Sequence, residues 1–283
     1  MKLGITNTEY TRPYGISEGY KKMKRHGYDH SDYQHFINTE TEFFKSDISS
    51  FERALSEETK IAQSEGILFC QAHGPWRHPP IDLLESDRAK RIDEMKKSIY
   101  GTAVLNCKNW VVHPFMPFGS NSDEQPQKMI EINLEALSAL CDYAKTVNVN
   151  VCIENMPFPK LPLATVEALI GFMDTVNREN FKFCLDTGHS IVCKEDVAES
   201  IRKLGADRLV ALHIHDNDGT KDTHHIPFSG IIDWESVNTA LNEISYGGVF
   251  SLECAPLRAK DAPDTWEKAE IDLANIAKKI IRV

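Results

Sequence analysis

The chain of 283 residues contains no apolar run that approaches the roughly 18 residues needed by a membrane-spanning helix. Its first ten residues, Met1 to Tyr10, lack the continuous apolar stretch of a secretory signal peptide. Positive charge is also scarce, because 42 Asp and Glu outnumber 32 Lys and Arg and leave a formal net charge of −10. A phosphate backbone needs a basic face, so nucleic acid is an unfavourable partner, as is a membrane. We expect a cytoplasmic protein.

Two further absences narrow the class of protein. The seven cysteines form no CxxC pair and are odd in number, which predicts free thiols in a reducing compartment rather than a disulfide framework. No glycine-rich phosphate-binding fingerprint follows a β-rich run, so a dinucleotide-binding fold has no support. No linker, low-complexity tract or shift in composition divides the chain. We therefore expect one domain over residues 1–283.

Short β-rich runs alternate with longer helical patterns along the whole chain. Eight strands are predicted, at Lys2–Asn7, Gly27–Tyr33, Ile67–His73, Trp110–Phe115, Asn150–Asn155, Phe181–Asp186, Leu209–His215 and Val249–Ala255. Two helices are clear: one begins at Pro126, and one follows a cap at Asp264 or Thr265. Strict alternation predicts parallel strands with right-handed crossovers. Eight repeats favour the α/β class, as a single (β/α)8 TIM barrel.

Ionisable residues gather at the ends of successive predicted strands. They are His73, His113, Glu154, Asp186, His213, His215 and Glu253. In a barrel these ends share one face, where active sites are built. Side chains two apart share a strand face, so Cys152 should lie below Glu154 and Cys184 below Asp186. Such a buried, charged group needs a counter-charge, and nitrogen and oxygen ligands with no evident thiolate suit zinc, manganese, cobalt or magnesium.

Apolar residues follow several of the same strands. They could cover a bound small molecule or simply pack the loops, and they are Trp76, Phe115, Phe118, Met156 and Phe158. Trp234 follows Ile232 and Asp233 at a predicted helix start, and we expect it to be structural.

Short motifs carry a family resemblance from the third strand to the eighth, in the right order. They are Cys152–Asn155, Leu185–His189, His213–Gly219, Asp222–Gly230, Ile232–Trp234 and Leu252–Glu253. Together they resemble the xylose-isomerase-like TIM barrel superfamily, also called AP endonuclease family 2. Within it they are most similar to the sugar phosphate isomerase/epimerase group, which includes tagatose 3-epimerase-like enzymes.

The resemblance implies one divalent metal ion, held by Glu154, Asp186, His213 and Glu253. His213 is assigned by its spacing to Asp216 in a His-x-x-Asp pattern, but His215 shares its strand face and stays an alternative. His189 matches a histidine that contacts substrate in the family.

The resemblance also implies a mechanism and a substrate class. The metal would bind the carbonyl and hydroxyl oxygens of a sugar and stabilise an enediolate, while Glu154 and Glu253 exchange the proton as base and acid. The residues expected to surround the sugar are His73, His113, His189, His215, His224 and Trp76. A family arginine after the seventh strand has no counterpart at Gly219–Lys221, and no clear phosphate site is present. A sugar and a sugar phosphate are therefore both open as substrate.

Two alternatives remain. Zinc-dependent endonuclease IV enzymes, which cut DNA at apurinic or apyrimidinic sites, resemble this chain at the four metal positions and at His73, His113, His189, Asp222 and His224. Further ions could then bind at His73, His113, Asp222 and His224. The acidic balance favours the isomerase. A sugar-binding protein without catalysis is less favoured, because both acid/base glutamates are present. A homo-oligomer is compatible with either alternative.

Overall fold

The computed structural model describes residues 1–80 and 82–281, so the predicted domain 1–283 also includes residues 81 and 282–283, which lie outside the described part. All eight predicted strands are present and form one parallel sheet. Their bounds are β1 Lys2–Thr6, β2 His30–Tyr33, β3 Leu68–His73, β4 Asn109–Val112, β5 Asn150–Glu154, β6 Phe181–Asp186, β7 Leu209–His213 and β8 Val249–Leu252. Because β4, β7 and β8 end earlier than predicted, His113, His215 and Glu253 lie just beyond their strands.

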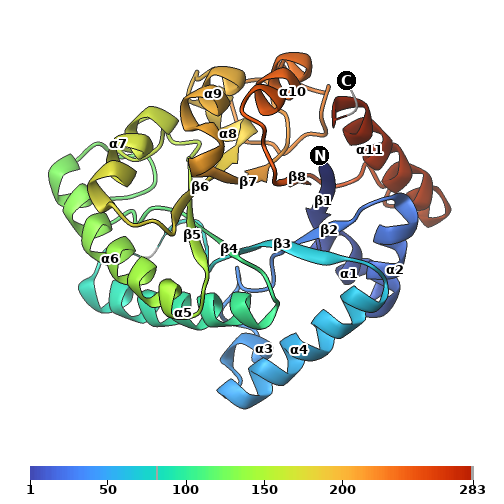
Figure 1. Cartoon of the computed structure of the whole chain (residues 1–283), viewed down its shortest axis with the longest axis horizontal. Coiled ribbons are helices and arrows are strands. Elements are labelled where there is room, and N and C mark those ends of the chain that lie inside the picture. The colour runs from blue at the N-terminus through green and yellow to red at the C-terminus, as the bar shows by residue number, and fades with distance from the viewer. Residues whose placement is uncertain (81, 282–283) are drawn as a thin grey trace.

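The sheet closes into a barrel, as the alternation of strands and helices predicts. Neighbouring strands follow chain order from β1 to β7, and β1 also pairs with β8. The last gap, between β7 and β8, is bridged beyond the strand end of β7. There the Ile214 amide donates to the Ser251 carbonyl at 2.9 Å, and the Glu253 amide donates to the Ile214 carbonyl at 3.0 Å. Figure 1 shows the resulting ring of strands with helices outside it.

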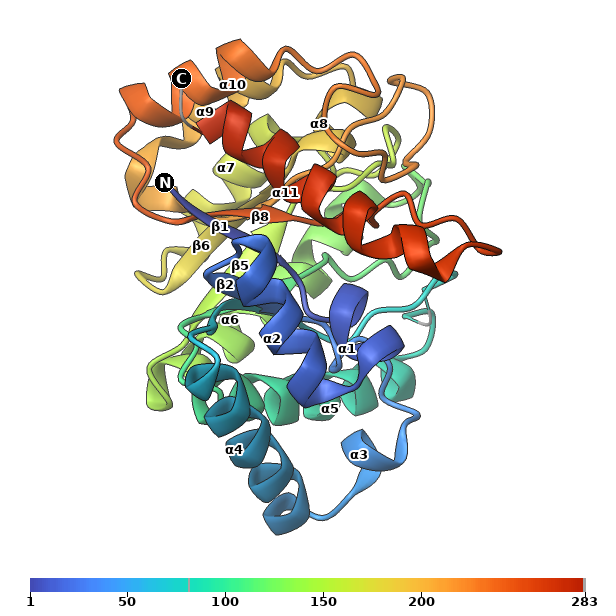
Figure 2. The same cartoon turned by 90° about the vertical axis from the view of Figure 1, so that its right-hand side faces the viewer.

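The helices form the outer layer. Their bounds are α1 Thr8–Tyr14, α2 Ile16–His26, α3 Glu42–Lys45, α4 Ile48–Ser64, α5 Glu85–Val104, α6 Pro126–Thr146, α7 Val166–Val176, α8 Thr187–Val192, α9 Val197–Arg208, α10 Trp234–Glu243 and α11 Trp266–Ile281. Helix α6 begins at Pro126 as predicted, and a 3₁₀ turn over Pro263–Thr265 precedes α11. Helix α11 contacts both α10 and α2, so it completes the helical ring (Figure 2).

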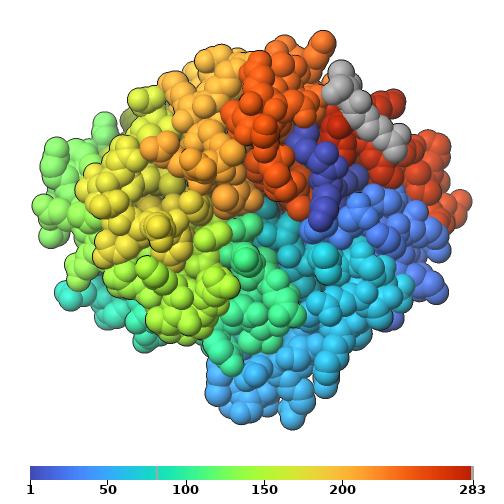
Figure 3. All heavy atoms as spheres, in the orientation of Figure 1, coloured from blue at the N-terminus to red at the C-terminus, as the bar shows by residue number. Residues whose placement is uncertain are grey.

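Strand parity separates two cores. Large apolar side chains fill the space between strands and helices, while a small inner cluster of Val111, Cys152, Cys184 and Ala211 fills the barrel axis. These inner residues each stand two positions before His113, Glu154, Asp186 and His213. The predicted layout is confirmed: small buried residues lie inside the barrel below a charged rim. The opening that the ribbon leaves at the centre of Figure 1 is filled by side chains in Figure 3.

The expectations on the cysteines and on membrane-spanning helices can be compared with the structure. All seven cysteines are free, as predicted. Within residues 1–80 and 82–281, no helix combines the length and the apolar character needed to cross a bilayer.

Candidate metal and sugar site

The four predicted ligands converge at the carboxyl ends of the strands. Ligand atoms of Glu154, Asp186, His213 and Glu253 all lie within 4.8 Å of one another. The Nδ1 atom of His213 lies 2.8 Å from Oε1 of Glu154 and 3.1 Å from Oε2 of Glu253. All but Glu253 are almost completely buried, and the side chain of Glu253 is 15% exposed. The barrel therefore brings four distant segments to one point.

Local structure fixes the orientation of Asp186. Its Oδ1 atom accepts a hydrogen bond from the His189 amide at 2.7 Å and so caps α8. Its Oδ2 atom lies 2.9 Å from Nε2 of His215. Gly188 follows in the same turn, and a Cβ atom there would collide with the His215 ring. The Thr187–His189 motif is thus a tight turn that aims a carboxylate into the barrel.

Asp32, on β2, is a site residue that the sequence did not reveal. Its Oδ2 atom lies 3.0 Å from Nε2 of His213, and both side chains are fully buried. The same oxygen accepts a hydrogen bond from Gln71 at 3.2 Å. Because Asp32 occupies Nε2, the other ring nitrogen of His213 faces the glutamates. A carboxylate behind a histidine is the usual way in which a ligating imidazole is oriented.

Gln34 was also missed. It follows β2, and its Nε2 atom donates to Oε1 of Glu253 at 2.9 Å. The backbone amide of Gln34 donates to Oδ1 of Asn7 at 3.0 Å. This support leaves Oε2 of Glu253 directed at His213. The only sequence signal for Asp32 and Gln34 is their place at the end of the second strand.

The residues present fit a divalent cation. Glu154, Asp186 and Glu253 are acidic groups at one point, and within the described part of the chain their ion pairs are with histidines, never with Lys or Arg. Buried carboxylates without a fixed cation favour binding of a metal. Oxygen and imidazole donors suit zinc, manganese, cobalt and magnesium to different degrees. Cys184 also lies within 4.8 Å of Glu154 and His213, but burial raises the pKa of its thiol and favours the protonated form.

A second group of possible ligands lies beside the first. His189, His215, Asp222 and His224 have ligand atoms within 4.8 Å of one another. Oδ2 of Asp222 lies 3.2 Å from Nε2 of both His189 and His224. The rings of His215 and His224 stack with centroids 4.0 Å apart. His215, the alternative to His213, therefore belongs to this second group.

A third group lies on the other side of Glu154. Nε2 of His113 is 2.9 Å from Oε2 of Glu154, and Nε2 of His73 is 3.5 Å from the same oxygen. The indole of Trp76 packs on His113 with ring centroids 4.3 Å apart. Glu154 thus contacts this group through Oε2 and His213 through Oε1, and the His73 ring also stacks on His213 with centroids 5.6 Å apart.

Burial and acidic neighbours shift the pKa values of the histidines at the site. Burial lowers the pKa of His113 to about 4, although Glu154 opposes this change. Burial also disfavours charge on His189, but Asp186 and Asp222 outweigh it and raise the pKa of His189 to about 9. Neighbouring histidines therefore differ in charge because of their different acidic neighbours.

The pKa values of Glu154 and Glu253 are shifted in opposite directions. Burial disfavours the charged form of both. For Glu154, His213 and His113 outweigh burial and hold the pKa well below its usual value. For Glu253, burial together with Glu154 and Asp186 raises the pKa. Two carboxyl groups with such different environments are suited to opposite roles in proton transfer.

A cavity of about 470 Å³ opens over these groups. Five of the six residues predicted to contact a sugar line it: His73, His113, His189, His224 and Trp76. The sixth, His215, is fully buried behind His224 and does not line it, so a direct substrate contact by His215 has no support. Ile37, Met156 and Phe158 supply apolar wall, and Glu154 and Glu253 form part of the floor. Trp234 is structural, as expected: it is buried and donates to Asp216 at 3.1 Å.

The family assignment follows from a comparison with known proteins. The model of the xylose isomerase-like TIM barrel family matches residues 21–273. The chain belongs to this family. The resemblance carried by the sequence motifs is therefore confirmed.

Individual relatives are distant. The chain is 22% identical over 198 residues to D-psicose 3-epimerase of Agrobacterium fabrum, which covers 69% of this chain and 66% of the relative. It is 26% identical over 195 residues to inosose isomerase of Bacillus subtilis, covering 65% and 69%. The chain spans about two thirds of the length of these curated relatives.

A solved structure shows the same fold. The IOLI protein with a binding zinc atom aligns over 99% of this chain and 98% of its own, with a TM-score of 0.78 and 20% identity. The bound zinc is a property of that protein, and the likeness to it shows the fold. The donor set of the present chain provides the independent support for a metal here.

Proposed function

We propose that this protein is a metal-dependent isomerase or epimerase of a sugar or sugar phosphate. The observation that carries the proposal is the placement of Glu154 and Glu253 beside the same Nδ1 atom of His213, in the lining of a cavity of about 470 Å³. Two carboxyl groups beside one imidazole and an open cavity are what proton transfer next to a carbonyl requires. Relatives that are sugar epimerases and isomerases support the same reaction class.

One divalent ion would be held by Glu154, Asp186, His213 and Glu253, whose ligand atoms lie within 4.8 Å of one another. When bound, it supplies a Lewis acid that polarises a carbonyl oxygen and makes the adjacent C–H bond more acidic. Asp32 keeps Nδ1 of His213 directed at this position. Zinc, manganese, cobalt and magnesium all remain candidates.

The residues of the chain would move the proton. One glutamate removes the proton from the carbon next to the carbonyl, and the electron pair of the broken C–H bond enters an enediolate. The other glutamate returns a proton to the opposite face of the same carbon, which gives the epimer, or to the neighbouring carbon. In the second case the proton of the hydroxyl group also passes to the former carbonyl oxygen, which gives the isomer. Gln34 holds Oε1 of Glu253 during this exchange. Trp76 and Phe158 exclude water from one side of the cavity.

The histidines would recognise the hydroxyl groups of the substrate. His73 and His113 reach the cavity from one side of Glu154, and His189 and His224 reach it from the other. Imidazole can donate or accept at each nitrogen, so these four side chains can bind several hydroxyl groups in different orientations. We propose that His215 acts instead through Asp186 and His224, which it contacts.

A nuclease of the endonuclease IV type is the second candidate, because the structure brings the further ligands close to the first four. His73 and His113 join Glu154, while His189, Asp222 and His224 form their own group. Up to two more ions could therefore bind. Occupancy alone would not establish a nuclease, since clustered histidines can bind zinc without that activity. The net charge of −10 and the sugar-converting relatives favour the isomerase.

The test combines metal content with two activity assays. Purified protein, stripped with a chelator and reloaded with each candidate metal, should interconvert at least one ketose or ketose phosphate and should not cut a duplex with an abasic site. Efficient, salt-sensitive incision that is lost in His113→Ala would replace the isomerase with the nuclease. Binding of metal and sugars without turnover of any sugar would instead indicate a sugar-binding protein without catalysis. A cytoplasmic location and a homo-oligomeric state stay predictions.

A further inference from the structure

A second cavity, of about 230 Å³, lies next to the proposed sugar site. The two cavities share Ile37 and Trp76 as lining residues. Trp76 therefore separates them: its indole contacts His113 of the sugar site, and the guanidinium of Arg91 lies over the same ring at 6.0 Å. The two cavities therefore adjoin at Trp76.

Arg91, on α5, brings a buried positive charge to this second cavity. Its side chain is 8% exposed and its Nη1 atom pairs with Oδ1 of Asp82. Its Nη2 atom is buried and has no hydrogen-bond partner among residues 1–80 and 82–281. Buried donors are rarely left unpaired, and guanidinium groups in particular are normally satisfied by an oxygen. The unsatisfied donor is an independent indication that Arg91 can take a further acceptor.

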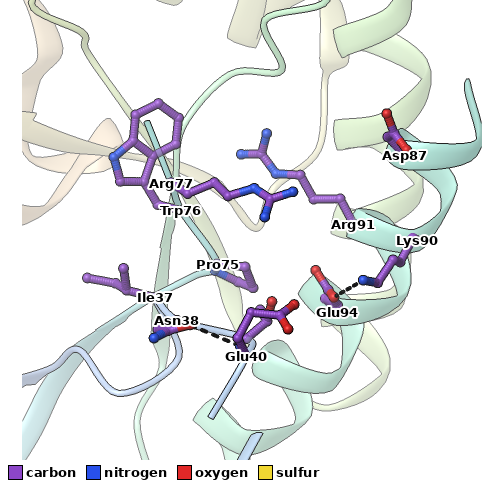
Figure 4. Close-up of a pocket in the computed structure, with 11 residues that line it drawn as sticks. Ile37, Asn38, Glu40, Pro75, Trp76, Arg77, Asp87, Lys90, Arg91 and Glu94 are labelled. Atoms are coloured by element: carbon purple, nitrogen blue, oxygen red, sulfur yellow. Dashed lines mark hydrogen bonds and ion pairs between the residues drawn. The ribbon is translucent and has the colours of Figure 1, made fainter. Parts of the chain in front are cut away.

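Arg77 supplies a second guanidinium to the same cavity. It follows β3 and Trp76, is exposed, and makes neither a hydrogen bond nor an ion pair with the described part of the chain. Figure 4 shows Arg77 and Arg91 extending toward one another from different segments, beside Trp76. Two neighbouring guanidinium groups offer several N–H donors to one anion.

Asp82 neutralises Arg91, whereas two of the acidic residues that line the cavity pair with lysines. Glu40 is bonded to Lys45 at 2.6 Å, and Glu94 lies 3.6 Å from Lys90. Asp87 lies in the first turn of α5, and in Figure 4 it is directed away from the two guanidinium groups. Arg77 therefore carries the net positive charge near Trp76, and Nη2 of Arg91 adds an unused donor.

We propose that this cavity binds an anionic group, a phosphate or a carboxylate, that is carried by the substrate and held by Arg77 and Arg91. The inference rests on the proposed function, since it assigns a class of sugar to that site. Oxygen atoms of a phosphate or carboxylate match the planar fork of a guanidinium, which binds them by paired hydrogen bonds. The substrate is thus an acidic sugar whose reacting carbons lie over Glu154 and Glu253, with its charged end past Trp76.

The first test measures binding of inorganic phosphate to the metal-loaded protein by calorimetry. We expect Arg77→Gln to weaken phosphate binding about tenfold or more, because a charge-assisted hydrogen bond contributes roughly that much. Arg53→Gln is the matched control, since Arg53 is an exposed arginine on α4 that does not line the cavity. Equal phosphate affinity in wild type and Arg77→Gln would overturn the site, whether or not any sugar is converted.

The second test compares substrates. For wild type, kcat/KM should be higher for a ketose phosphate or a keto sugar acid than for the matching neutral ketose, and the better of the two identifies the anion. Arg77→Gln should reduce this preference about tenfold, and Arg53→Gln should leave it unchanged. Phosphate binding that depends on Arg77 without any preference for charged sugars would contradict binding by the substrate. Turnover of neutral sugars alone would refute the inference and leave the proposed function intact.

Discussion

Oδ2 of Asp32 and Nε2 of His213 lie 3.0 Å apart at the centre of the barrel, although 181 residues separate them in the chain. Both side chains are fully buried, and the second nitrogen of His213 faces Glu154 and Glu253. A metal-ligating histidine is commonly fixed by a carboxylate on its other nitrogen. In this chain Asp32 is therefore a positioning residue for the proposed ion.

Replacement of Asp32 should weaken metal binding and leave the fold intact. We expect Asp32→Asn to reduce metal affinity about 10- to 100-fold, the usual effect of losing the partner behind a ligating histidine. Titration of the chelator-stripped protein with zinc measures this directly. Asp29→Asn is the control, because Asp29 is an exposed residue near the start of the same strand that pairs with Lys24. Identical zinc affinities in the two variants would show that Asp32 does not position His213.

Asp186→Ala should abolish tight metal binding. Its carboxylate belongs to the proposed first site and also contacts His215 of the second group, so both sets of donors are affected. Because Asp186 lies at the rim and not in the packed layers, the circular dichroism spectrum should be that of a folded barrel. Asp222→Ala should remove only an ion of the second group. Unchanged metal content in Asp186→Ala would contradict the assignment.

The proposed proton transfer needs both Glu154 and Glu253, one as base and the other as acid. Glu154→Gln and Glu253→Gln keep the size of each side chain but remove its ability to exchange a proton. Each should lower kcat on the order of 10²-fold or more, since a positioned acid or base typically contributes that much. Metal content is measured alongside turnover, so that loss of the ion is not mistaken for loss of chemistry. Near wild-type kcat in either metal-loaded variant would exclude that residue from the reaction.

The free energy of unfolding should depend on pH through Glu58. This carboxyl group on α4 accepts hydrogen bonds from Tyr20 at 2.6 Å and Tyr33 at 3.2 Å, yet burial raises its pKa. A pKa raised in the folded state favours the protonated form. Its contribution is therefore complete below the unfolded pKa, about 4.3, and is lost as pH rises through the folded value.

Glu58→Gln removes this ionisation, so its stability relative to wild type should improve as pH rises above about 4.3. Urea unfolding of both proteins at several pH values measures the difference. Glu57→Gln is the control, because Glu57 is its exposed neighbour on the same helix. A difference between Glu58→Gln and wild type that stays constant with pH would show that Glu58 has no raised pKa in the folded protein.

The strands, and the meeting of Glu154, Asp186, His213 and Glu253 at one end of the barrel, were predictable because both follow local rules. Alternating β-rich and helical runs specify a barrel, and its parallel strands bring their carboxyl ends to one face. Asp186 and Glu154 end strands that were predicted within one residue. Asp32 was missed because β2, His30–Tyr33, is four residues long and largely polar, so no periodic pattern marks which side chain faces the axis.

Other features depend on packing that no local pattern encodes. His213 and His215 share a strand face, and they are separated only because β7 ends at His213 and the chain then turns toward His225. The second cavity depends on Arg77 and Arg91, which come from a loop and a helix that the sequence does not place side by side. No clear phosphate motif in the sequence marks this cavity beside Trp76, and it was therefore not predicted.

The most direct test of the account is solvent exchange at carbon. Metal-loaded protein is incubated in deuterium oxide with ketoses and ketose phosphates, and the product is analysed for label, with chelator-treated protein as control. We predict deuterium at the epimerised or isomerised carbon of at least one substrate, only when metal is present, and none with Glu154→Gln. A product formed without solvent label, or at the same rate in the chelator-treated protein, would contradict metal-dependent proton transfer by these glutamates.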